Sequence, residues 1–269
     1  AAMASAGRLR ADMGTSGYRR QYEEWKAENK GRDPAADLDA ELLPDPDQVR
    51  VRCYATQSTH KTLTALRQGS MIHVFDVDYG KRVAEAFEDA YMTHTSTSPN
   101  YQILASLDVG RRQVELEGYE LVQQSVALAM TLRERVQESP ELARYFRVLK
   151  PRDLVPEQHR PSGLEEFYRP GSGYRHLGDA FENDEFVLDP TRVTIGIGLT
   201  GMDGDTLRSH LMDRYDIQIN KTSRNTLLFM LNIGTTRGAI AYLLEVLSQI
   251  SRELSEKGDV ESDLEREIA

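Results

Sequence analysis

The change of apolar periodicity in the last third of the chain constrains the fold more than any other feature of the sequence. Apolar side chains alternate with small or polar ones over 193–199, which predicts a strand with one buried face. Residues 226–233 are almost all apolar, as in a central buried strand, and the apolar positions over 240–254 return with the period of a helix. Residues 190–256 therefore predict a small α/β sandwich of strand, helix, strands and helix.

The sequence predicts where the first helix of this sandwich begins and which of its faces is apolar. Asp203 or Asp205 can cap its first turn, because a carboxylate accepts hydrogen bonds from the free backbone amides there. Leu207 and Leu211 are four residues apart, so they share one face of the helix. We expect that face to point into the core.

The rest of the chain divides by composition and pattern. Helix formers fill 16–29, prolines and acidic residues follow, and β-rich stretches lie at 49–55 and 69–77. The longest helical pattern comes after a Ser/Thr/Pro turn at 96–99. We expect five segments: a helix with an acidic, Pro-rich loop at 1–48, part of a larger domain with a long interdomain helix at 49–138, an irregular connection at 139–189, the small α/β domain at 190–256 and a frayed tail at 257–269.

Charge and cysteine content exclude several classes of protein. A formal net charge of −10 repels phosphate backbones and anionic headgroups, so we expect neither nucleic acid nor a membrane surface as a partner. Cys53 is the only cysteine, which excludes a disulfide framework and a cysteine-based zinc site, and the histidines lack metal-site spacing, so we expect no metal. No apolar run is long enough to cross a bilayer. These features are typical of a cytoplasmic enzyme.

A polar segment between the two β-rich stretches concentrates chemically useful groups. Ser58, His60 and Lys61 place a hydroxyl, an imidazole and an amine within four residues, directly after a predicted strand. A neutral lysine amine can attack an aldehyde, a hydroxyl can hydrogen-bond a phosphate, and an imidazole can move protons. Taken alone, the cluster is more typical of solvated surface residues, because most lysines are exposed.

Three blocks of sequence favour the chemical interpretation. The segment Ala55-Thr56-Gln57-Ser58-Thr59-His60-Lys61, followed by Gly69-Ser70-Met71-Ile72-His73-Val74, resembles the cofactor-lysine segment of the bacterial ornithine/lysine/arginine decarboxylase family. Residues 92–106 are similar to the family's Thr/Ser-rich segment before its interdomain helix. The blocks at 186–190, 193–194, 204, 220–222 and 234–237 resemble its small C-terminal domain. Together the resemblance covers about 49–254.

The resemblance implies a fold, a cofactor and an oligomer. The fold is α/β: the C-terminal portion of an aspartate-aminotransferase-type (fold type I) domain that binds pyridoxal 5'-phosphate, represented by 49–138, followed by the small α/β domain. Lys61 would hold the cofactor as a Schiff base, Ser58 would contact its phosphate, and His60 would lie against it and help to protonate the product. Ser96 and Thr97 match a segment that reaches the phosphate of the neighbouring subunit, which implies a homodimer or a higher homo-oligomer with a shared active site.

The sequence departs from the family at two places. The family's phosphate loop, ring-stacking residue and ring aspartate all precede the lysine, and the sixty residues before Lys61 contain no recognisable stretch of that kind. We therefore expect the chain to be a fragment or one half of a split enzyme. Asn220 stands where many members with basic substrates carry a glutamate, and an amide attracts a cationic tail less than a carboxylate does. The alternative interpretation of Asn220 is a plain turn or strand-edge residue.

The function that the resemblance implies is decarboxylation of an amino acid, a basic one such as arginine, lysine or ornithine, to an amine and CO2. Two alternatives stay open. Another fold-type-I enzyme, such as an aminotransferase, would use the same lysine. A non-catalytic or truncated module would instead pack against a complete decarboxylase, and the missing upstream half favours that alternative for this piece alone.

Overall fold

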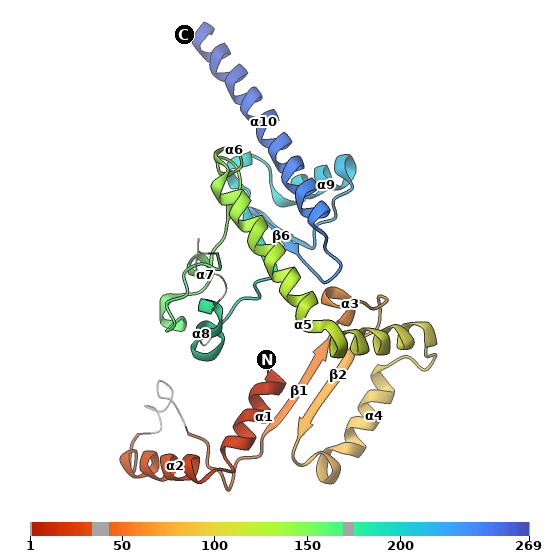
Figure 1. Cartoon of the computed structure of the whole chain (residues 1–269), viewed down its shortest axis with the longest axis vertical. Helices are drawn as coiled ribbons and strands as arrows, with labels where there is room; N and C mark the ends of the chain where they lie inside the picture. Colours follow the sequence, from red (N-terminus) through yellow and green to blue (C-terminus); the bar gives the residue numbers. More distant parts are fainter. Residues whose placement is uncertain (1, 34–42, 169–174, 185, 269) are drawn as a thin grey trace. The chain divides into compact units, whose positions relative to one another are not determined.

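A computed structural model describes the backbone of residues 2–33, 43–168, 175–184 and 186–268 (Figure 1). For 2–4, 175–176 and 258–268 only the backbone is described. The chain separates into two compact units. The first consists of Ala1–His60 and Ala65–Gly110, and the second of Lys61–Thr64 and Arg111–Ala269.

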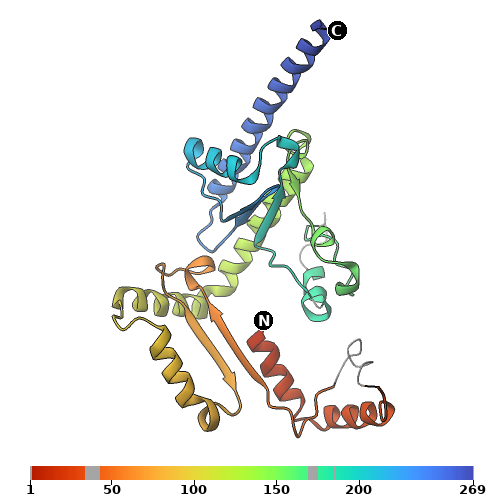
Figure 2. The same ribbon diagram turned by 180° about the vertical axis from the view of Figure 1, so that it is seen from behind.

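The first unit is built on a two-stranded antiparallel sheet. Strand β1 (Arg52–Gln57) pairs with β2 (Met71–Asp76), and Tyr54 lies opposite Val74. The hairpin lies between α1 (Ala2–Asp12) and α4 (Ala84–His94), as both views show (Figures 1 and 2). Helix α2 (Ser16–Glu28) confirms the helix predicted at 16–29, whereas α1 was not expected from the sequence.

Polar contacts hold the end of this hairpin. The buried carboxylate of Asp78 accepts hydrogen bonds from Arg50 Nε at 3.0 Å and Arg52 Nη2 at 3.1 Å, and Tyr54 donates to Asp76 at 2.6 Å. The hydrogen bonds from Arg50, and then those from Arg52, hold the pKa of Asp78 well below its usual range. A short π-helical turn, η2 (Tyr79–Val83), follows. Polar contacts matter here because the buried apolar residues among those described in this unit are few: Met13, Tyr22, Val51 and Leu107.

The second unit contains a four-stranded antiparallel sheet in the order β3-β4-β6-β5. Strand β6 lies between two neighbours, as expected of a central strand, although only alternate side chains of it are buried. The sheet confirms the mixed α/β class of the predicted small domain. Its strands and helices are β3 (Arg147–Val148), β4 (Arg192–Gly196), β5 (Lys221–Ser223), β6 (Thr226–Met230), α9 (Gly204–Tyr215) and α10 (Arg237–Ile268).

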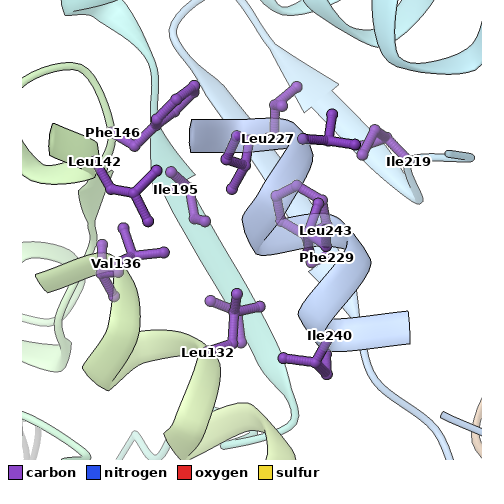
Figure 3. Packing of buried hydrophobic residues seen from close by; sticks show 14 of the residues in the cluster. Leu132, Val136, Leu142, Phe146, Ile195, Ile219, Leu227, Phe229, Ile240 and Leu243 are labelled. Atoms are coloured by element: carbon purple, nitrogen blue, oxygen red, sulfur yellow. The ribbon is translucent and has the colours of Figure 1, made fainter. Parts of the chain in front are cut away.

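One apolar core holds this sheet against its helices (Figure 3). Helix α5 (Tyr101–Glu138) contributes Leu132, β4 contributes Ile195, and α10 contributes Leu247, each at most 1% exposed. Helix α9 begins as predicted, because the side chain of Asp203 accepts a hydrogen bond from Thr206 N at 2.8 Å. Its two predicted inward residues, Leu207 and Leu211, are fully buried.

The stretch 139–189, which the sequence describes as an irregular connection, contains several short elements. They are α6 (Pro140–Ala143), β3, α7 (Pro151–Leu154), the 3-10 turn η3 (Glu157–His159) and α8 (Arg175–Asn183). A second apolar cluster packs this stretch on α5 through Met130, Phe167 and Leu177. A further 3-10 turn, η4 (Gly198–Thr200), follows β4. At the other end of the unit, the backbone of α10 stays helical to Ile268, beyond the start of the tail that was expected to fray.

Within the ranges that the structure describes, we find no helix long and apolar enough to span a membrane.

Candidate functional site

The predicted lysine segment forms a single helical turn directly after β1. The strand ends at Gln57, Ser58 follows, and α3 (Thr59–Thr62) carries His60 and Lys61. Ser58 and Lys61 are exposed, and His60 is half-buried. The strand-then-turn arrangement predicted from the sequence is therefore present, and the lysine that it carries is exposed.

A contact with the backbone orients His60. Its Nδ1 lies 3.4 Å from the carbonyl oxygen of Gly69. Because a carbonyl can only accept, Nδ1 is the donor in this contact, which leaves Nε2 for other partners. Gly69 is buried, and a Cβ there would lie 2.8 Å from Ile103 Cγ2, so only glycine brings this carbonyl so close to α5 without a shift.

The hydroxyl of Thr59 is the one unusual polar atom of the turn. Thr59 is 1% exposed, and its Oγ1 has no hydrogen-bond partner among the described residues. Buried polar atoms are nearly always hydrogen-bonded, so an unsatisfied one needs an explanation. The lysine turn and the residue before it therefore have hydrogen-bonding side chains at three consecutive positions, Ser58, Thr59 and His60.

The other predicted site residues lie elsewhere in the chain, on segments of their own. Ser96 and Thr97 are exposed in the turn after α4, where Ser96 Oγ accepts from Ser98 N at 3.1 Å. Asn220 is exposed in a bend immediately before β5. The structure thus brings Ser58, His60 and Lys61 together through their positions in the chain, whereas Ser96, Thr97 and Asn220 lie on separate segments.

A hollow of about 280 Å³ in the second unit contains none of the predicted site residues. Cationic side chains line it, but they are paired: Lys150 with Glu166 at 2.5 Å and Arg147 with Asp153 at 2.7 Å. We therefore place no part of the site there. The described residues also contain no group of three or more His, Cys, Asp or Glu side chains that could hold a metal ion.

Comparison with known proteins gives a consistent family. The family model described as Orn/Lys/Arg decarboxylase, major domain, matches residues 35–239. The constitutive lysine decarboxylase of Escherichia coli (strain K12) is 33% identical over 213 residues, which cover 74% of this chain and 28% of that protein. An arginine decarboxylase of Bacillus anthracis is 24% identical over 76% of this chain and 35% of its own length.

Solved structures agree with the sequence matches. The lysine decarboxylase LdcF of Francisella novicida gives a TM-score of 0.56 at 26% identity, covering 81% of this chain and 30% of that chain. The constitutive lysine decarboxylase of E. coli gives 0.53 at 29% identity, covering 80% and 30%. The expected fold class is confirmed by these neighbours, and the chain spans about 28% of the E. coli enzyme. Since the family model matches well over half of its residues, the chain belongs to the Orn/Lys/Arg decarboxylase family, matched through the major domain.

Proposed function

We propose that this chain supplies the cofactor-lysine part of a pyridoxal-phosphate-dependent decarboxylase, which converts a basic amino acid to an amine and CO2. The observation that carries the proposal is the exposed Lys61 on a turn with Ser58 and His60. The relatives named above are lysine and arginine decarboxylases, which supports a basic substrate. Because the chain spans about a third of those proteins or less, the activity is proposed for the whole protein.

The groups of the lysine turn fit this cofactor by their chemistry. The exposed amine of Lys61 can react with an aldehyde, and the exposed hydroxyl of Ser58 can donate a hydrogen bond to a phosphate oxygen. The unsatisfied hydroxyl of Thr59 adds a second donor in the same turn. An anion with an aldehyde group therefore matches the local set of donors.

Each residue of the turn then has a defined task. Pyridoxal phosphate, when bound, supplies an electron sink for the pair that remains when CO2 leaves. Lys61 holds the cofactor through Nζ, which must first lose its ammonium proton to become a nucleophile. The contact of Nδ1 with Gly69 leaves Nε2 of His60 for other partners, so we assign His60 the proton transfers at this turn, including return of a proton to the product.

Three further assignments stay predictions. Ser96 and Thr97 would reach the phosphate of a neighbouring subunit in a homo-oligomer, and their exposure in a turn supports an intermolecular role. Asn220 would face the tail of the substrate. Its exposure before β5 leaves it accessible, and its amide would bind a cationic tail more weakly than a glutamate would.

The experiment that tests the proposal is covalent trapping. The chain is incubated with pyridoxal phosphate, reduced with borohydride, digested and mapped by mass spectrometry. We expect the label on Lys61, loss of that label in Lys61→Arg, and an unchanged Lys61 label in the control Lys81→Arg, since Lys81 is also exposed but lies in η2.

Turnover separates the remaining alternatives. Production of an amine and CO2 from lysine, arginine or ornithine supports the decarboxylase, whereas formation of a keto acid indicates an aminotransferase. Label on Lys61 without any turnover, in the whole gene product, favours the non-catalytic module. Label spread evenly over exposed lysines contradicts the site assignment.

A further inference from the structure

Thr62, the residue after Lys61, is bonded to the small α/β region of the same unit. Its hydroxyl Oγ1 accepts a hydrogen bond from Arg192 Nη2 at 3.1 Å, and its carbonyl accepts one from the backbone amide of Ile233 at 3.2 Å. Thr62 ends the single turn α3, and carbonyls at a helix end have no partner within the helix. The turn that carries the lysine is therefore fixed at its end by groups from β4 and from the segment after β6.

The side chain of Arg192 is also fixed by contacts other than the one with Thr62. Its Nη1 donates to Thr191 Oγ1 at 2.9 Å and to Leu231 O at 3.3 Å, and the carboxylate of Asp189 lies 3.7 Å from Nη2. Its backbone carbonyl also accepts from Arg133 Nη2 at 2.8 Å. A planar guanidinium with several fixed partners loses little further freedom when it binds one more group.

The second donor, the amide of Ile233, lies on a closed turn. The side-chain oxygen of Asn232 accepts from Gly234 N at 2.9 Å, and the backbone amide of Asn232 donates to Thr235 Oγ1 at 3.0 Å. These bonds fix the peptide groups on both sides of Ile233. Both donors to Thr62 therefore come from preformed structure.

We propose that Arg192 is a positioning residue for Lys61: through Thr62 it sets the direction in which the lysine stem leaves its turn. The inference rests on the proposed function, because it gives Lys61 a reacting partner. Attack on an aldehyde depends on how the amine is presented, and small errors in placement slow such reactions strongly. Arg192 touches neither the reacting atoms nor the cofactor in this role, so its effect acts through Thr62 alone.

The test compares substitutions at Thr62 and Arg192, whose effects on link formation should not add because both remove the same hydrogen bond. Thr62→Val removes the acceptor and keeps the shape, Thr62→Ser keeps the hydroxyl, and Arg192→Met removes the donors while keeping a long apolar stem. The readout is the rate at which the lysine–cofactor link forms at saturating pyridoxal phosphate, followed by its visible absorbance, with the melting temperature of each variant measured alongside.

We expect Thr62→Val and Arg192→Met each to slow link formation about 3- to 10-fold, which is the change in rate that corresponds to the loss of one hydrogen bond. The double variant should be no slower than the slower single variant, and Thr62→Ser should stay within about 2-fold of the parent. If Arg192→Met does not fold, the comparison of Thr62→Val with Thr62→Ser still tests the proposal.

The possible failures are distinguishable. If the parent chain is labelled at Lys61 but Thr62→Val reacts at the parent rate, or Thr62→Ser is as slow as Thr62→Val, the positioning role is wrong and the proposed function stands. If the parent chain shows no label at Lys61, both proposals fall together.

Discussion

Arg133, a buried cation on α5, gives a prediction whose size follows from its contacts. It is 3% exposed, and its guanidinium lies 4.8 Å from the ring centroid of Phe167. Its Nη1 donates to Pro190 O at 2.7 Å and its Nη2 to Arg192 O at 2.8 Å. Replacement by methionine keeps much of the volume but leaves the carbonyls of Pro190 and Arg192 without the partner that Arg133 supplies.

Two opposing terms set the expected loss of stability. Two hydrogen bonds from a charged donor contribute about 5 kcal/mol together. Burial lowers the pKa of Arg133 to about 10, because its charged guanidinium is desolvated, and methionine would relieve part of that cost. We therefore expect Arg133→Met to lower the free energy of unfolding by about 2 kcal/mol and the melting temperature by about 4–8 °C.

The assay is thermal and urea unfolding of the whole chain, followed by circular dichroism. Arg135→Met is the matched control, because Arg135 lies two residues away on the same helix and is exposed. Its midpoint should stay within about 1 °C of the parent, as is usual for surface substitutions. Equal midpoints for Arg133→Met and the parent would refute the account of these two hydrogen bonds.

Three further changes test other parts of the second unit. Leu247→Ala empties a fully buried position in the core and should lower the free energy of unfolding by about 2–5 kcal/mol, measured by urea titration. Gly204→Ala should cost about 1–3 kcal/mol by the same measurement, because its Cβ would overlap the carbonyl oxygen of Ser223. The hydrogen bond from Tyr168 to Glu134 raises the pKa of Tyr168 to about 12. The stability that this hydrogen bond contributes is complete below pH 10 and is lost as the pH rises through 12. Tyr168→Phe should therefore lose less stability over this range than the parent, measured by melting temperature against pH.

Matched variants separate these effects from general damage. Met212→Ala removes a side chain that is 45% exposed, so a loss as large as that of Leu247→Ala would contradict the assignment of the core. Gly238→Ala adds a Cβ whose nearest neighbour is 3.8 Å away, and it should be tolerated where Gly204→Ala is not. For Tyr168, parallel curves of parent and variant between pH 10 and 12 would show that the bond to Glu134 has no effect.

The sequence predicts the parts of the fold whose signal is local. Strand β4 and helices α9 and α10 each have the apolar period of their own structure, so they are identified without knowledge of their partners. The segment that carries Lys61 follows a strand, as predicted, while the role of Lys61 stays a prediction. A local pattern was sufficient in each of these cases.

The parts that were missed depend on distant partners or weak patterns. Strand β3 has two residues, too few for any period, and exists because Arg147 and Val148 pair with β4. Helix α1 has no clear apolar stripe, so its sequence pattern does not distinguish a helix from an irregular polar segment. The bond from Arg192 to Thr62 joins residues 130 positions apart, and neither residue belongs to a motif.

The hairpin of β1 and β2 has a consequence for the behaviour of this polypeptide in solution. Among the described strands each pairs only with the other, so each has an outer row of peptide groups with no strand beside it. Such rows recruit further strands, and in concentrated samples they join molecules edge to edge. Light scattering that grows with protein concentration, and that falls when a proline interrupts the outer row of β1, would identify this hairpin as the source of the self-association.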